Sequence, residues 1–280
     1  MAMNRAHMAV LVSAITIGSA FGATWEESFD GKFSKSYFVE PEVTGGGWSN
    51  TRINPSTGYS GKAGSVSLVK TPARKGEGAV RCIRAEGGRR MELELVNRDE
   101  NDSPRLNQHS WAGISILVPE TNAANKGMCI QWHGGFPGKA QGKEYALGPE
   151  CCLRFDDGKF VYCSNAKESK AAAPVQKSTT IVENVKPGEW YDFVFHQFFS
   201  LKEDGLTEIW VNGKKVYTQN GCNCFYYRTK FAFKFGMYGT GTPGAIYFDQ
   251  AKVITGSGSY EQVAPDGAKP AATPTPKPVK

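Results

Sequence analysis

The chain has 280 residues, of which 40% are hydrophobic and 21% are charged, and its formal net charge is +6. This length and composition support a substantial buried core, which excludes a wholly disordered chain. No run of Lys and Arg and no aromatic–basic RNA motif accompanies the positive charge, so nucleic acid is not an expected partner. The mild excess of cations favours an acidic partner, and we expect an anionic polysaccharide.

The first 22 residues have the features of a secretory signal peptide. Arg5 precedes an apolar run over residues 8–21, and the small residues Gly22 and Ala23 follow. The run is too short to span a bilayer, and the sequence has no second hydrophobic stretch of about 18 residues. We therefore expect residues 1–22 to be removed, leaving a secreted, extracellular and monomeric product without membrane association.

Residues 23–256 consist of short β-prone runs broken by Gly, Pro, Asn and Asp, with no long amphipathic helix. More than ten such runs predict an all-β catalytic domain, a two-sheet antiparallel β-sandwich of the jelly-roll (concanavalin-like) type. Residues 257–280 are rich in Pro, Thr and Lys without an apolar pattern, which predicts a disordered tail. The clearest strands are predicted at 65–69, 79–85, 90–96, 112–118, 128–133, 190–199, 207–211, 231–238 and 245–253.

Two hairpins are predicted from Asp157-Gly158 and Asn212-Gly213, which are preferred two-residue turns. Counting outward from the first turn places Cys152 opposite Cys163, so we predict a disulfide between them. The seven cysteines are an odd number, and at least one is therefore unpaired within the chain. Their spacing matches no usual zinc ligand set, and no metal site is predicted from them.

A polar pattern stands out at residues 129–135, Cys-Ile-Gln-Trp-His-Gly-Gly. Side chains alternate along a strand, so Gln131 and His133 share one face while Ile130 and Trp132 share the other. Gln131 can donate a hydrogen bond and His133 can move a proton near neutral pH, which suits half of an acid–base site. The alternative is a structural histidine at a strand end.

Two more strands carry polar faces opposite apolar ones. In residues 90–95, Arg90, Glu92 and Glu94 alternate with three apolar residues. In residues 230–238, Lys234 and Tyr238 lie opposite four apolar side chains, and the small residues Ala232 and Gly236 on the same face leave room for a ligand. The alternative for these faces is a solvated sheet surface.

The R-x-E, Q-x-H and K-x-G-x-Y patterns occur in this order at residues 90–92, 131–133 and 234–238. With the motifs at 111–119, 188–196 and 204–213, they resemble the jelly-roll polysaccharide lyases, most closely the glucuronan lyase and heparin lyase I-like group. A more distant resemblance is to the alginate lyases with Q-I-H. The resemblance covers roughly residues 80–255, although the motif at 188–193 also occurs in lectin-like sandwiches.

The resemblance implies β-elimination of a uronic-acid polymer, glucuronan before others, with no cofactor required for catalysis. Such a reaction needs a group that neutralises the uronate carboxylate and an acid–base group. By resemblance, Arg90 and Gln131 neutralise the carboxylate and Tyr238 and His133 transfer protons. The substrate-binding residues that it implies are Lys234, Arg89, Trp132 and His196.

Some residues depart from the family pattern or admit other interpretations. Glu94 stands where the alginate lyases have a second arginine, which counts against alginate. Strand alternation places His196 on the face of Trp190 and Val194, so a buried structural role is an alternative to substrate binding. The acidic loop 97–102 has oxygen ligands for a structural Ca²⁺, or is simply solvated.

Two other classes of function remain open from the sequence. A sandwich glycoside hydrolase would use Glu92 and Glu94 as its carboxylate pair, although the central Asp of the usual E-x-D-x-E pattern is missing. A non-catalytic carbohydrate-binding module would explain the aromatic residues, the export and the tail without any chemistry.

Overall fold

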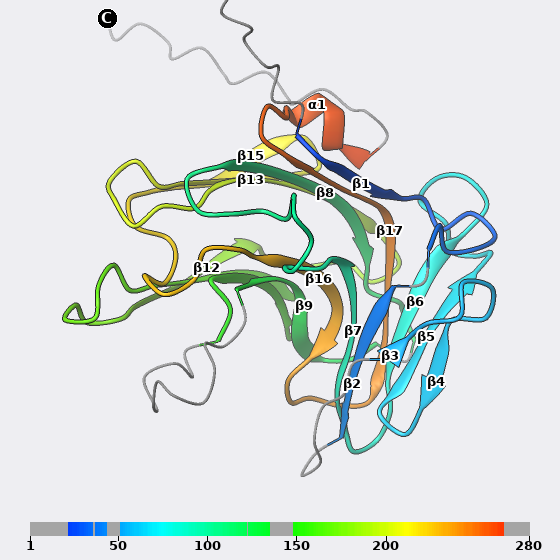
Figure 1. Cartoon of the computed structure of the whole chain (residues 1–280). Coiled ribbons are helices and arrows are strands. Elements are labelled where there is room, and N and C mark those ends of the chain that lie inside the picture. Colours follow the sequence, from blue (N-terminus) through cyan, green and yellow to red (C-terminus); the bar gives the residue numbers. More distant parts are fainter. Residues whose placement is uncertain (1–21, 36, 44–50, 122, 135–147, 266–280) are drawn as a thin grey trace, which may run out of the picture.

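The computed structural model describes residues 22–35, 37–43, 51–121, 123–134 and 148–265. In this part of the chain, two antiparallel sheets stack face to face and one short helix lies outside them, which confirms the all-β sandwich (Figure 1). One sheet has nine strands and the other has eight. The predicted signal peptide and most of the predicted tail lie outside the described residues.

The nine-stranded sheet has the order β15-β14-β13-β8-β17-β6-β5-β4, with β1 paired to β17. Its strands are β1 (Thr24–Glu27), β4 (Tyr59–Gly61), β5 (Gly64–Val69), β6 (Ala79–Arg84), β8 (His109–Leu117), β13 (Trp190–Phe198), β14 (Leu206–Val211), β15 (Lys214–Asn220) and β17 (Gly244–Thr255). The eight-stranded sheet has the order β12-β11-β10-β9-β16-β7-β2-β3. Its strands are β2 (Phe38–Val43), β3 (Thr51–Arg52), β7 (Gly88–Val96), β9 (Lys126–His133), β10 (Cys151–Asp156), β11 (Lys159–Ala166), β12 (Val175–Val182) and β16 (Ala232–Tyr238).

The main core lies between the two sheets and is built by strand alternation. Met91 and Leu93 of β7 and Phe233 and Phe235 of β16 are fully buried in it. Each of these residues is followed by one that faces the opposite, outer side of the eight-stranded sheet. Burying one face of each strand therefore fixes which polar side chains lie on the other.

Both predicted hairpins are confirmed by their turn geometry. Asp157 and Asn212 have φ of 44° and 49°, and the glycines after them also have positive φ. Cys152 and Cys163 are directly opposed in the first hairpin, as predicted. Both are free thiols in the structure, so the disulfide itself stays a prediction.

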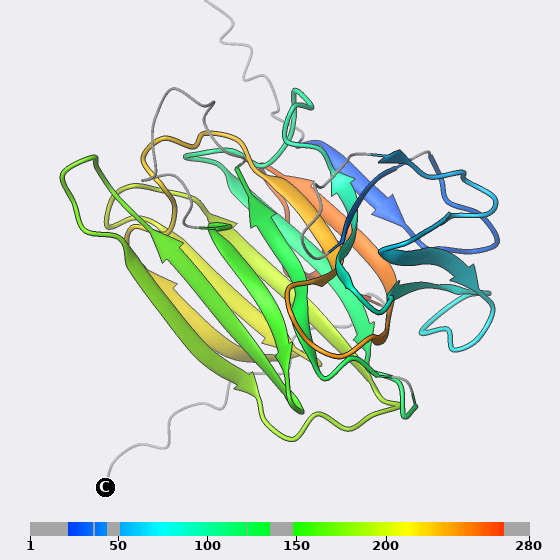
Figure 2. The same cartoon turned by 90° about the horizontal axis from the view of Figure 1, so that it is seen from below.

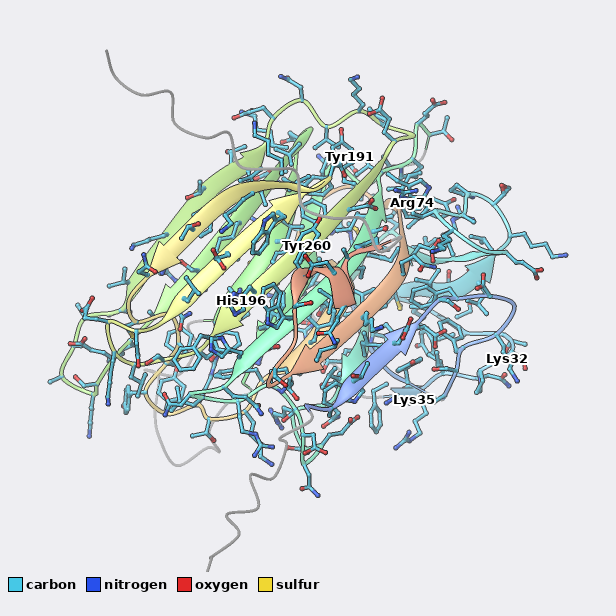
Figure 3. The ribbon with its side chains drawn as sticks, turned by 90° about the horizontal axis from the view of Figure 1, so that it is seen from above. Lys32, Lys35, Arg74, Tyr191, His196 and Tyr260 are labelled. Atoms are coloured by element: carbon cyan, nitrogen blue, oxygen red, sulfur yellow. The ribbon has the colours of Figure 1, made fainter. Side chains whose placement is uncertain are left out.

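The outer face of the nine-stranded sheet carries a second, smaller apolar cluster. Helix α1 (Tyr260–Val263) covers it, and Tyr260 packs against Trp210 with ring centroids 5.4 Å apart (Figure 3). The prediction that the disordered tail begins at residue 257 is therefore wrong, because Tyr260 and Val263 bury apolar surface that β13 and β14 leave uncovered. None of the described helices has the length and apolarity needed to cross a membrane.

Candidate active site

Figure 2 shows the eight-stranded sheet from below. A cavity of about 320 Å³ opens on the outer face of this sheet. Strands β2, β7, β16 and β9 lie next to one another there, so the three polar faces predicted from the sequence become one surface. The cavity is lined by Glu40, Glu42, Arg89, Arg90, Glu94, Asn97, Arg98, Asp99, His133, Gly148, Pro149, Ala232, Lys234 and Tyr238. We call it the Tyr238 cavity.

The strand register decides which side chains meet across this surface. Tyr238 of β16 is paired with Arg90 of β7, and Lys234 lies between Gln131 of β9 and Glu94 of β7. Gly236 stands between these two pairs with φ of 144°, and a Cβ there would lie 2.2 Å from the Met91 carbonyl oxygen. Only glycine suits this position, and the irregularity between Phe235 and Tyr238 lies against β9, where it brings Tyr238 opposite Met128.

Arg90 joins Tyr238 to a group of buried carboxylates. Its guanidinium carbon lies 3.9 Å from the centre of the Tyr238 ring. Its Nη1 donates to Glu40 Oε2 at 2.8 Å, and its Nε lies 3.3 Å from Glu42 and 3.6 Å from Glu92. These contacts fix the guanidinium against the tyrosine ring.

Glu40 and Glu42 are site residues that the sequence reasoning missed. Glu40 Oε1 accepts a hydrogen bond from Lys234 Nζ at 2.6 Å, and Glu42 Oε1 accepts one from Arg89 Nη1 at 2.9 Å. Burial raises the pKa of Glu40, but Lys234 and Arg90 outweigh it and hold that pKa below its ordinary value. The signal was available, because Glu40 and Glu42 alternate with apolar residues in residues 38–43.

Gln131 is held by a second buried carboxyl group. Its Nε2 donates to Glu92 Oε1 at 2.6 Å, and neither side chain is more than 1% exposed. Burial raises the pKa of Glu92 to about 7 although Arg90 opposes the change. Glu94 has its pKa raised to about 7 by burial in the same way, with Lys234 opposing.

His133 ends β9 and lines the Tyr238 cavity. Burial, followed by the charges of Arg228 and Lys234, holds its pKa well below 6.5, so its imidazole is neutral at neutral pH. Behind it, Arg228 Nη1 donates to Glu150 Oε1 at 2.8 Å, and Gly134 N donates to the same carboxylate at 2.9 Å. This buried ion pair anchors the chain immediately after His133, and no local pattern in the sequence indicates it.

Tyr238 lies at the rim of the cavity and is partly exposed. Its hydroxyl oxygen accepts a hydrogen bond from Arg89 Nη2 at 3.5 Å. A phenol between two guanidinium groups, with a neutral imidazole in the same cavity, can exchange protons with a bound anionic ligand. Lys234 and Arg90 are the cations that such a ligand meets on the cavity floor.

Two residues expected to bind substrate lie elsewhere. Trp132 is fully buried in the core, with ring centroids 5.0 Å from Phe195 and 4.8 Å from Phe233, because alternation turns it away from Gln131. His196 lies on the outer face of the nine-stranded sheet (Figure 3), where it stacks on Trp111 at 3.9 Å. The substrate-binding role expected for Trp132 is therefore wrong. His196 does not line the Tyr238 cavity, and its burial agrees with the structural alternative.

Side chains of the loop proposed as a Ca²⁺ site, residues 97–102, form hydrogen bonds and ion pairs with other protein side chains. Asn97 Nδ2 donates to Glu94 Oε2 at 3.1 Å, and Arg98 forms an ion pair with Asp99 at 3.3 Å. No cluster of three or more His, Cys, Asp or Glu side chains suited to a metal ion occurs in the described ranges.

The fold and this site together indicate the class of protein to which the chain belongs. On the outer face of a β-sandwich, one cavity is lined by Tyr238, His133 and several cations, and Gln131 is buried beside them. The polysaccharide lyase family model matches residues 42–252, and the chain belongs to this family. The glycoside hydrolase and the non-catalytic module are therefore not retained.

Solved structures with the same fold agree with this assignment. The endo-β-1,4-glucuronan lyase from the fungus Trichoderma reesei superposes with a TM-score of 0.65 at 17% identity, covering 89% of this chain and all of the other. The alginate lyase AlyC3 in complex with dimannuronate has a TM-score of 0.50 at 13% identity, covering 80% of this chain and 91% of the other. No curated protein sequence matches the chain.

Proposed function

We propose that the protein cleaves a uronic-acid polymer, glucuronan in the first place, by β-elimination. The observation that carries the proposal is the contact between the Tyr238 ring and the Arg90 guanidinium at the edge of a cavity that also holds Lys234 and His133. Similarity of fold to a glucuronan lyase favours glucuronan. We further propose that the protein is secreted, acts as a monomer and needs no cofactor for catalysis.

The first requirement of the reaction is to stabilise charge on the uronate carboxylate. Removing the proton from C5 spreads negative charge into that carboxylate, so donors and cations must face it. We assign this role to the amide of Gln131 and the guanidinium of Arg90, with Lys234 binding the same sugar. Glu40 and Glu92 hold these three groups in place through the contacts described above.

The second requirement is proton transfer. In β-linked glucuronate the C5 hydrogen and O4 lie on the same side of the ring, so one group can serve both. Tyr238, as a phenolate, takes the C5 proton, and the electron pair of the C5–H bond forms the C4–C5 double bond. The C4–O4 bond breaks with its electrons on O4, and the Tyr238 hydroxyl returns the proton to O4. One product has a new non-reducing end with an unsaturated uronate.

We assign His133 a substrate-binding role in the elimination of glucuronan, because its imidazole is neutral. An imidazole whose pKa lies well below 6.5 accepts a hydrogen bond from a sugar hydroxyl without adding positive charge. For a uronate whose C5 hydrogen and O4 lie on opposite sides, His133 would be the base and Tyr238 the acid. The similarity to a dimannuronate-bound alginate lyase makes mannuronate the second candidate substrate.

Replacing Tyr238 with Phe tests the proposal. The change keeps the ring that packs on Arg90 and removes only the hydroxyl, so the fold is preserved and the proton-transfer group is lost. We expect elimination of glucuronan, measured by the ultraviolet absorbance of the unsaturated uronate, to fall about 10²–10⁴-fold.

The control is Tyr247→Phe, because Tyr247 also lies under an arginine, with Arg81 5.8 Å from its ring centre, but on the nine-stranded sheet. We expect this variant to keep the parent rate. A folded Tyr238→Phe protein that produces unsaturated uronate as fast as the Tyr247→Phe control would refute the mechanism.

A further inference from the structure

A second cavity, of about 390 Å³, adjoins the first on the outer face of the eight-stranded sheet. It shares Arg89 and Tyr238 with the Tyr238 cavity, so Tyr238 stands at the boundary between the two. Its other lining residues are Lys126, Gly127, Met128, Arg154, Asp156, Gly239 and Thr240. We call it the Arg154 cavity.

The strand register places the Arg154 cavity in line with Tyr238. Tyr238 of β16 is paired with Met128 of β9, and Met128 is paired with Arg154 of β10. Arg154 is therefore two strands from Tyr238 in the same cross-strand row, about 9–10 Å away at the usual strand spacing. An extended ligand bound at Tyr238 and running across the strands reaches Arg154.

The two cavities differ in charge. The Tyr238 cavity is lined by four cations and four carboxylates, which balance. The Arg154 cavity is lined by Arg89, Lys126 and Arg154 against Asp156 alone, so three positive charges face one negative charge. The excess positive charge of the groove therefore lies on the side of Tyr238 away from Lys234 and His133.

Two cations of the Arg154 cavity, Lys126 and Arg154, are available to a ligand, whereas Arg89 is paired with Glu42. The ion pairs formed by the described residues include none with Lys126. Among the described residues, Arg154 forms its ion pair with Asp156, at 3.2 Å, and both side chains are substantially exposed, so this pair adds little stability. Met128 and the edge of Tyr238 supply apolar surface between them, as a sugar ring requires.

We propose that the Arg154 cavity is a second uronate subsite, in which Lys126 and Arg154 bind the carboxylate of a sugar on the far side of the scissile bond from the Lys234 sugar. This inference rests on the proposed function. It makes the groove open on both sides of Tyr238, so a polymer is held across the cleavage point and not only at an end.

The test uses the double variant Lys126→Met, Arg154→Met in the Tyr238→Phe background, with β-1,4-linked glucuronate oligosaccharides of increasing length as probes. The matched control is Lys159→Met, Lys252→Met, which removes two cations that pair with Glu183 and Glu26 outside both cavities. Isothermal titration in a series of salt concentrations gives Kd for each oligosaccharide.

We expect the Lys126–Arg154 variant to bind long oligosaccharides about tenfold or more weakly than the control, as for loss of charge-assisted hydrogen bonds. Its Kd should depend less steeply on salt, since fewer exposed charges contribute. The shortest oligosaccharide that still binds should show no difference. In the active background, the same pair of changes should raise KM for the polymer and leave kcat unchanged.

Equal affinities of the two double variants for long oligosaccharides would overturn the subsite while leaving the proposed function intact. Failure of the proposed function gives a different result. In that case no glucuronate or mannuronate oligosaccharide binds at any length and the parent forms no unsaturated product, which overturns both.

Discussion

At the scale of single residues, Glu92 is a carboxyl group whose ionisation the fold opposes. It is fully buried, its shortest contact with a cation is 3.6 Å, and burial raises its pKa from 4.5 to about 7. A carboxyl group whose pKa is higher in the folded than in the unfolded protein lowers the free energy of unfolding only at pH values where it ionises. For Glu92 this loss of stability is absent below about pH 4.5, grows as the pH rises and reaches its full size above about pH 7.

We therefore predict that Glu92→Gln becomes more stable relative to the parent as the pH rises from 5 to 9. The glutamine keeps the shape and removes the charge, so the gain at high pH is up to about 3 kcal/mol. Urea unfolding at several pH values measures it. The exposed Glu183, paired with Lys159, supplies the control Glu183→Gln, which should show no such trend. A pH-independent difference for Glu92→Gln would contradict the prediction.

At the scale of elements, the β10–β11 hairpin places two thiols directly opposite each other on adjacent strands. Cys152 is paired with Cys163 on one side and with Gln131 on the other. A hydrogen bond with the Cys152 thiol, followed by one from Ser178, lowers the pKa of Cys163 to about 6 despite burial. A thiolate at neutral pH reacts readily with an oxidant, so this pair is ready to form a disulfide.

We predict that protein refolded in air contains the Cys152–Cys163 disulfide, as found by peptide mapping without reduction. Closing this short loop should raise the free energy of unfolding by about 2–3 kcal/mol. Cys152→Ser should lose the increase, whereas Cys222→Ser, away from the hairpin, should keep it. Free thiols at both positions in the oxidised protein would show that the opposed strands do not bring the sulfur atoms together.

Local patterns were sufficient to predict much of the structure at this scale. The Asp157-Gly158 turn fixed the register of β10 and β11, and alternation along β7, β9 and β16 placed Arg90, Gln131 and Lys234 on one face. Trp132 shows that strand alternation was a better guide to its position than the family resemblance. Alternation assigned it to the core correctly, whereas its expected role in binding had no support from the strand pattern.

At the scale of the whole molecule, the order of strands within a sheet was the information that the sequence lacked. Strand β2 lies next to β7, and this pairing brings Glu40 and Glu42 to Arg90. Likewise, Arg228 and Glu150 meet at 2.8 Å from segments far apart in the sequence. Such contacts depend on which strands, far apart in the sequence, become neighbours in a sheet, so no local sequence pattern predicts them.

The same arrangement determines how charge is distributed along the groove. The Tyr238 cavity balances its four cations with Glu40, Glu42, Glu94 and Asp99, so it can hold a uronate by hydrogen bonds without an excess of positive charge. The excess lies in the Arg154 cavity, beyond the tyrosine. A polymer with a carboxylate on every sugar meets both environments at once.

The central claim is that this protein cleaves the glycosidic bonds of a polyuronate by β-elimination. The most direct test supplies the purified parent with glucuronan, alginate, heparinoids and a neutral β-glucan, and follows both ultraviolet absorbance and reducing ends. We predict that the two signals rise together with glucuronan, more slowly or not at all with the other acidic polymers, and not with the neutral glucan. Reducing ends formed without the absorbance of an unsaturated uronate, or with the neutral glucan, would contradict it.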